Sequence, residues 1–264
     1  MNNSTLALRS AIAFLFSACL LAGCGGTKVL KESQPIQTTK PLAAASDQQV
    51  SATLDWVIVR DGPGTWAKNA DWDEYLLRIN NQSEQSIQVT QLIVIDSLDT
   101  RIESQPGRKQ LVKSSKKTTK RYKKSRMKVK AGRGAGTMLV AGAAVTVVGV
   151  GAATAATLGG AYGAAAGGAG AAASGLLLLG PALAVGGVVR GVNNSKVNKQ
   201  IELRQTVLPL EIPANSELGL DVFFPLAPSP KTVELVYSDA TGEHRLVIDT
   251  STALDGLHID TPRE

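Results

Sequence analysis

Cysteine and histidine are nearly absent from this sequence. The two cysteines, Cys19 and Cys24, lie near the N-terminus, and the histidines are His244 and His258. The rest of the chain can therefore form no disulfide and offers no thiolate nucleophile or CxxC metal site. Neither histidine has a metal-ligand spacing, so we interpret both as surface residues. No nucleophile–base pair is recognisable, and we expect no enzymatic activity, cofactor or metal.

Acidic residues are absent between Arg108 and Arg133, where thirteen basic residues fall. The remainder of the chain has 15 basic and 22 acidic residues, so the basic isoelectric point describes one segment. Like charges at this density repel one another and resist folding alone, which predicts a basic linker over residues 105–133. Tyr122 is its only aromatic residue. The lack of stacking groups argues against nucleic acid as a partner.

The basic linker directly precedes a long apolar run, an arrangement typical of binding to anionic lipid headgroups. Lipopolysaccharide or another envelope polymer, or no partner at all, remain alternatives. The candidate headgroup-binding residues are Lys116, Lys117, Lys120, Arg121, Lys123, Lys124, Arg126, Lys128, Lys130 and Arg133.

No charged residue occurs between Gly134 and Val189, a run of 56 residues that includes 15 Gly and 18 Ala. A helix needs about 20 apolar residues to cross a bilayer, so the run is long enough for two spans. We predict a helical membrane hairpin over residues 134–192 that turns within Gly159–Gly170. A Gly/Ala linker or a hairpin buried in a soluble oligomer are the alternatives.

Small residues recur at every fourth position of this run and therefore share one helical face. They are Gly151, Ala155, Gly159, Gly163, Gly167, Ala171 and Gly175. The pattern resembles the glycine-zipper segments of bacterial membrane proteins. That resemblance implies close helix packing and a homo-oligomer, or packing against an envelope protein partner.

Residues 1–23 have the features of a secretory signal: Arg9, then a short apolar stretch from Ala11 to Leu21. The stretch ends in Leu21-Ala22-Gly23-Cys24. This motif resembles the lipobox of bacterial lipoproteins, which implies cleavage before Cys24 and acylation of its thiol. By the same resemblance, Gly25 after the cysteine implies the outer membrane. We predict a flexible tether over residues 24–49.

Alternating apolar residues predict short strands on both sides of the apolar run. They cover Val50–Arg60, Glu74–Asn80, Ile87–Ile95, Leu203–Ile212, Leu218–Phe224, Thr232–Tyr237 and Arg245–Ile248. We expect a mainly β protein, an immunoglobulin-like β-sandwich whose halves, residues 50–104 and 200–250, are interrupted by the hairpin. Two separate β-units are the alternative. Residues 251–264 are predicted to be a polar tail.

Two further stretches invite a functional interpretation. Asp71, Asp73 and Glu74 lie near Trp66 and Trp72, but without an EF-hand spacing, so we predict a solvated loop. The two tryptophans would then be free to contact a partner, whereas Trp56 is predicted to be core. Residues 132–137 contain a glycine pattern without the Lys-Ser/Thr of a phosphate loop, and we assign them no function.

One conflict concerns the orientation of the chain. Basic residues flank both ends of the apolar run, which by the positive-inside rule would place the β-domain in the cytoplasm. The lipobox, a specific processing signal, places it in the periplasm, and we follow the lipobox. We therefore expect a lipid-anchored outer-membrane protein with a structural or assembly role that oligomerises through the hairpin. A transport or pore-forming subunit is the alternative.

Overall fold

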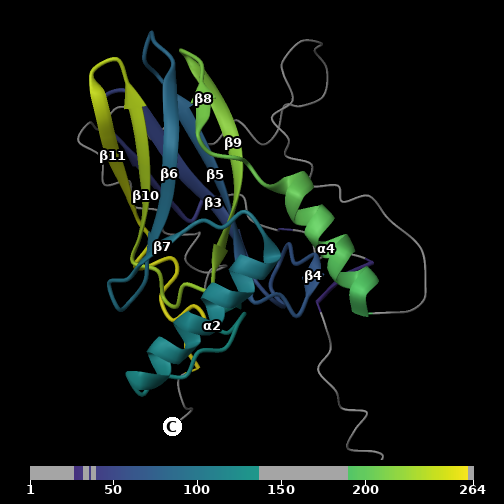
Figure 1. Cartoon of the computed structure of the whole chain (residues 1–264). Helices are drawn as coiled ribbons and strands as arrows, with labels where there is room; N and C mark the ends of the chain where they lie inside the picture. Colours follow the sequence, from purple (N-terminus) through teal and green to yellow (C-terminus); the bar gives the residue numbers. More distant parts are fainter. Residues whose placement is uncertain (1–26, 32–35, 37–39, 137–189, 261–264) are drawn as a thin grey trace, which may run out of the picture.

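The structure is a computed structural model that describes residues 27–31, 36, 40–136 and 190–260. The described part is mainly β, with antiparallel sheets and two helices (Figure 1). The predicted acylation site Cys24, the small-residue face and residues 137–189 of the predicted hairpin lie outside the described residues. No helix in the described part combines the length and the apolar character needed to cross a membrane.

A four-stranded sheet has the order β2-β3-β5-β9. Its strands are β2 (Ala43–Ser46), β3 (Val50–Ile58), β5 (Trp72–Asn81) and β9 (Ser216–Pro225). All neighbours are antiparallel, and β3 contains a bulge between Leu54 and Trp56.

A five-stranded sheet has the order β11-β10-β6-β7, with β8 also paired to β6. Its strands are β6 (Ile87–Ile95), β7 (Arg101–Glu103), β8 (Leu210–Ile212), β10 (Thr232–Asp239) and β11 (Gly242–Asp249). Two very short strands, β1 (Lys28–Val29) and β4 (Ala67–Lys68), form a separate pair.

Strands from before and after the apolar run pair directly with each other. Strand β9 follows β5 along its whole length, from Trp72 opposite Pro225 to Asn81 opposite Ser216. In the other sheet, β10 pairs with β6. The two parts of the sequence therefore build shared sheets and are not separate β-units.

The apolar faces of both larger sheets contribute to one buried cluster. Trp56, Phe223 and Phe224 come from the four-stranded sheet, and Leu92 and Tyr237 from the five-stranded one. Each fully buried large side chain contributes about 1.5–3 kcal/mol through removal of apolar area from water. The prediction that Trp56 belongs to the core is confirmed.

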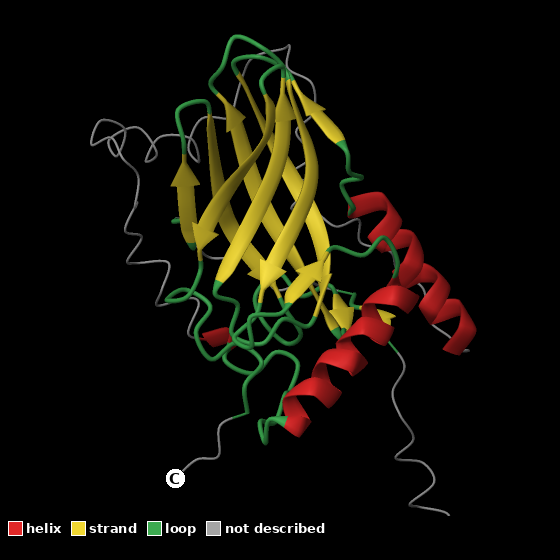
Figure 2. Ribbon diagram, turned by 60° about the vertical axis from the view of Figure 1, so that its left-hand side comes forward, coloured by secondary structure: helices red, strands yellow, loops and turns green. Residues whose placement is uncertain are grey.

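The helices α2 (Arg108–Lys124) and α4 (Arg190–Arg204) lie toward the same end of the sheets (Figures 1 and 2). Arg108 Nε of α2 donates to Asn198 Oδ1 of α4 at 3.2 Å. The prediction of an unfolded basic linker is wrong over α2. The helix forms because one of its faces packs against the β-domain, which offsets repulsion among its lysines.

Six of the seven predicted strands are present, and one is wrong in part. Leu203 and Arg204 end α4, and only Leu210–Ile212 of the segment Leu203–Ile212 is a strand. The helix is favoured because Val197 and Ile201, four residues apart, are both buried on one face.

The predicted tether and tail are also more ordered than expected. Leu42, Ala43 and Ala45 are buried, and β2 pairs with β3, so the segment from Leu42 onwards belongs to the domain. Near the other end, Leu254 and Leu257 are fully buried. Small and isolated apolar residues carried too little periodicity to reveal either segment.

Gly132 occupies a position that only glycine fits. Its φ is +77°, and an added Cβ would lie 1.9 Å from the Arg60 carbonyl oxygen. We expect Gly132→Ala to lower the free energy of unfolding by about 3 kcal/mol, because strain and a backbone clash add. Denaturant unfolding of the full chain in detergent measures this.

Gly136→Ala is the matched control, since nothing lies within 4 Å of a Cβ at that position. It should change the free energy of unfolding by less than about 0.5 kcal/mol. Equal losses in the two variants would contradict the packing at Gly132.

Candidate functional site

The most distinctive surface in the described part of the chain is one face of α2. The helix buries Leu111, Ser115, Thr118 and Tyr122, which recur at the spacing of a single helical face. Its seven exposed lysines are Lys109, Lys113, Lys116, Lys117, Lys120, Lys123 and Lys124. We call these seven residues the lysine face. At about 100° per residue, they occupy an arc of about 120° opposite the buried side chains.

Both apolar and polar contacts hold α2 against the β-domain. The Tyr122 hydroxyl donates to the Pro228 carbonyl at 3.1 Å and lies 2.8 Å from Ser97 Oγ. Burial raises the pKa of Tyr122 to about 12. Ser115 Oγ accepts the Leu226 N–H at 3.0 Å. The orientation of the lysine face is therefore fixed by the docked side of the helix.

The ten residues predicted to bind headgroups fall into two groups. Arg121 forms an ion pair with the fully buried Asp96, and Lys128 and Arg133 pair with Asp260. The hydrogen bond from Lys128 lowers the pKa of Asp260. The other seven are exposed: Lys116, Lys117, Lys120, Lys123, Lys124, Arg126 and Lys130. Arg121 in particular serves to dock the helix rather than to bind a ligand.

The segment just before the apolar run is hydrogen-bonded to the C-terminal part of the domain. The Gly132 N–H donates to His258 Nδ1 at 3.0 Å, and His258 Nε2 lies 2.8 Å from Asp73 Oδ2. Because Nδ1 accepts, Nε2 carries the proton and donates to Asp73. Asp73 and His258 are fully buried, so the predictions of a solvated loop and a surface histidine are wrong.

Helix α4, which follows the apolar run, is held at its C-terminal end by Glu74, the residue after Asp73 in β5. Arg204, the last residue of α4, donates through Nε to Glu74 Oε1 at 2.8 Å. Trp66 Nε1 donates to Glu74 Oε2 at 2.6 Å, and the Arg204 guanidinium lies 5.4 Å from the Trp66 ring centroid. Burial, followed by the charge of Glu74, raises the pKa of Asp221 to about 7.

Trp66 and Trp72 do not form a partner-binding surface. Their exposed fractions are 8% and 3%, and both line a small, partly open space beside Glu74. This space holds about one water molecule, so it offers no pocket for a substrate. Asp71 lies at the surface and pairs with Arg60. Among the described residues, no three His, Cys, Asp or Glu side chains gather as metal ligands.

The loop between β3 and β5 contacts three segments that lead out of the domain. Thr27 Oγ1 lies 3.5 Å from the Asn69 carbonyl, and the Leu30 N–H donates to the Trp66 carbonyl at 2.8 Å. At Gly62, an added Cβ would lie 3.4 Å from Ala135. Trp66 also contacts α4 through Arg204. The N-terminal segment, the segment before the apolar run and the C-terminal end of α4 therefore all contact residues 59–70.

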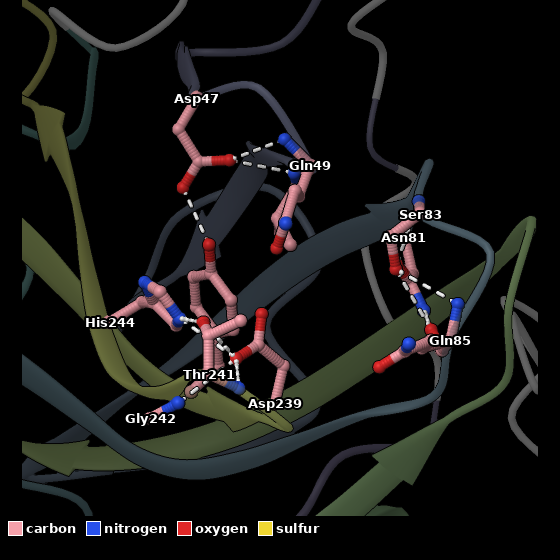
Figure 3. A network of polar contacts seen from close by, with 11 residues as sticks. Asp47, Gln49, Asn81, Ser83, Gln85, Asp239, Thr241, Gly242 and His244 are labelled. Atoms are coloured by element: carbon pink, nitrogen blue, oxygen red, sulfur yellow. Dashed lines mark hydrogen bonds and ion pairs between the residues drawn. The ribbon is translucent and has the colours of Figure 1, made fainter.

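A second polar cluster closes the β10–β11 hairpin (Figure 3). Asp239 Oδ1 accepts from Thr241 Oγ1 at 2.6 Å, from the Thr241 N–H at 2.7 Å and lies 3.0 Å from His244 Nε2. These hydrogen bonds, led by that of the Thr241 hydroxyl, lower the pKa of Asp239. Nearby, the Tyr237 hydroxyl donates to Asp47 at 2.7 Å.

Threonine, histidine and aspartate are the residue types of a nucleophile, a base and an acid, but their geometry here is different. In a catalytic triad the base contacts the nucleophile with one ring nitrogen and the acid with the other. His244 directs the same nitrogen, Nε2, to Thr241 and Asp239. The cluster therefore closes a turn, which explains why Asp239 bonds two consecutive backbone amides.

Asp221 makes the stability of the β5–β9 region depend on pH. Because its pKa is about 7 in the folded chain and near 3.8 when exposed, the folded chain binds more protons between these values. The free energy of unfolding should therefore fall as the pH rises from 4 to 7. We expect Asp221→Asn to remove on the order of 1–2 kcal/mol of this fall, measured by denaturant unfolding across that range.

Glu211→Gln, which neutralises an exposed carboxylate on β8, is the control. Its pH profile should follow that of the unmodified chain. A profile for Asp221→Asn that is as steep as the unmodified one would show that Asp221 does not titrate in this window.

Comparison with known proteins places this chain in no family. No family model matches the sequence, and neither a curated protein nor a solved structure matches the chain.

Proposed function

We propose that this chain is a lipid-anchored protein of the bacterial outer membrane with a structural or assembly role, oligomerising through its Gly/Ala-rich hairpin. The acyl chains on Cys24 hold the β-domain at the membrane from the periplasmic side. The hairpin packs against copies of itself or an envelope protein partner through Gly151, Gly159, Gly163 and related small residues.

One observation carries the proposal: both flanks of the apolar run are fastened by adjacent buried carboxylates. Asp73 holds the exit segment through His258, and Glu74 holds the return segment through Arg204. The exit segment and the C-terminal end of α4 are thus held by adjacent residues of β5, and α4, about 21 Å long from Arg190 to Arg204, leads from there to the end of the run, an arrangement that a two-arm hairpin allows. A single span would carry the two ends of the run to opposite sides of a bilayer.

The N-terminal segment supports the same arrangement. Thr27 lies three positions after Cys24 in the sequence and contacts Asn69, in the loop that also contacts Ala135 and Arg204. A chain extends at most about 3.5 Å per residue, so an acylated Cys24 stays within about 11 Å of Thr27. The anchor and the hairpin then enter the same membrane surface.

We also propose that the two larger sheets form an immunoglobulin-like sandwich. Three observations support this: the strands pair antiparallel, one buried cluster takes side chains from both sheets, and the chain passes from one sheet to the other between β5 and β6 and between β9 and β10. Such a domain is a rigid support for a membrane segment, and the buried Asp73 and Glu74 act in that support rather than in catalysis.

Replacement of Cys24 tests the anchor. Cys24→Ser removes the thiol that would carry the acyl chain, so incorporation of labelled palmitate should fall to background. Cys19→Ser, inside the predicted signal, is the matched control and should label normally. Palmitate labelling of the Cys24→Ser protein would show that the motif is not a lipobox.

Bulky residues on the small-residue face test the hairpin. We expect Gly159→Leu combined with Gly163→Leu to reduce crosslinked oligomers at least tenfold, because leucine side chains prevent close backbone approach. Gly160→Leu with Ala164→Leu adds the same bulk at the same spacing on a different face. If both pairs reduce crosslinking equally, or neither does, the zipper contact is not the oligomer interface.

A further inference from the structure

The lysine face carries charge of only one sign along the whole of α2. Between Arg108 and Lys124 there is no Asp or Glu, and the seven lysines lie on the side opposite the docked residues. Lysines three and four positions apart, such as Lys116, Lys120 and Lys124, are direct neighbours on the helix surface. Each such like-charge pair destabilises the helix by a few tenths of a kcal/mol.

Ordinary exposed helices avoid this cost by mixing acidic and basic residues. Here the repulsion is retained, and Asp96 pairs with Arg121 at the edge of the helix, away from the lysine face. A polyanion placed against the lysine face would relieve the repulsion among all seven lysines. The charge pattern therefore indicates a binding surface for negative charge.

The chemistry of the lysine face favours a flat and diffuse anionic partner. Lysine presents a compact, strongly hydrated point charge, whereas arginine forms the planar bidentate contacts used to recognise a defined group. The arginines of α2 are only partly exposed, and Arg121 is used within the protein. The face thus suits many loosely placed headgroups better than one phosphate in a fixed site.

The lysine face also lacks any group that could enter hydrocarbon. In the described part of the chain, the exposed large hydrophobic residues are Leu203, Val207 and Val247, none of them on α2. Leu111 and Tyr122, the large side chains of α2, are fully buried against the domain. Binding by this surface would depend on charge alone and would be strongly weakened by salt.

We propose that the lysine face binds the anionic headgroups of a lipid bilayer, with α2 lying flat on the membrane surface. The assignment of these headgroups to a membrane rests on the proposed function, in which the acyl anchor and the hairpin hold the domain at one membrane surface. Each lysine near an anionic surface contributes about fivefold to binding.

Lysine footprinting of the full chain tests this directly. The protein is mixed with vesicles of phosphatidylcholine alone or with added phosphatidylglycerol, acetylated briefly and analysed by mass spectrometry. We expect Lys116, Lys120 and Lys124 to be labelled at least fivefold more slowly with anionic vesicles. Protection should disappear at about 0.5 M salt, where charges are screened within a few ångströms. Lys196 and Lys199, exposed on α4, are internal references.

The outcomes separate this inference from the proposed function. Flotation of the protein with the vesicles on a density gradient measures membrane attachment in the same mixtures. If the protein floats but its lysine face is not protected from acetylation, the inference is overturned and the proposed anchor stands. Salt-sensitive protection by anionic vesicles, with no flotation on neutral ones, supports the inference and contradicts the anchor. Equal protection by inorganic phosphate at the same phosphate concentration would show an ion-binding site and overturn the assignment to a membrane.

A matched pair of variants measures the contribution of position. We expect Lys116→Gln with Lys120→Gln to weaken binding of the full-length Cys24→Ser protein to anionic vesicles about 25-fold. Lys196→Gln with Lys199→Gln removes the same charge from α4 and should weaken it less than threefold. Lys116→Arg with Lys120→Arg should bind normally. Equal loss from both glutamine pairs would mean that net charge, not the lysine face, directs binding.

Discussion

The pairing of β5 with β9 is the interaction on which the rest of the structure depends. It joins the parts of the chain that precede and follow the apolar run, in continuous register from Trp72 to Asn81. The entropic cost of closing such a long loop grows slowly with its length, by about 0.6 kcal/mol for each doubling. A long insertion is therefore tolerated once the ten-residue pairing and the buried side chains of β9 are in place.

The same pairing places two charged residues where their burial can be compensated. Successive side chains of a strand point to opposite faces, so Asp73 and Glu74 reach different neighbours. Asp73 meets a histidine whose other nitrogen is occupied by a backbone amide, and Glu74 meets an arginine and an indole N–H. A buried carboxylate without such partners would cost several kcal/mol. The strand therefore requires both flanks of the insertion to be folded against it.

Sequence periodicity identified the sheets well and the polar contacts poorly. Ile87–Ile95 was predicted with its observed bounds, because alternation is strong where one face of a strand is buried. Helix α2 was missed because two of its four buried residues, Ser115 and Thr118, are polar and lie among lysines. His258 and Asp73 are distant in sequence, and no local pattern indicates that they meet. The contact of Trp66 with Glu74 could have been suspected from their proximity in the sequence, but not that of Arg204 with both of them.

The order of α2 explains how a charged segment can become a defined surface. A helix of 17 residues with no acidic side chain and many like-charge neighbours has little stability alone. Its contacts with the sheets, through Leu111, Tyr122 and the Arg121–Asp96 pair, supply what is missing. The lysine face is therefore formed only when the segment after β9 and the loop after β6 are in place, because Tyr122 bonds to Pro228 and lies against Ser97. The surface that carries the charge and the strands that close the fold are parts of one cooperative unit.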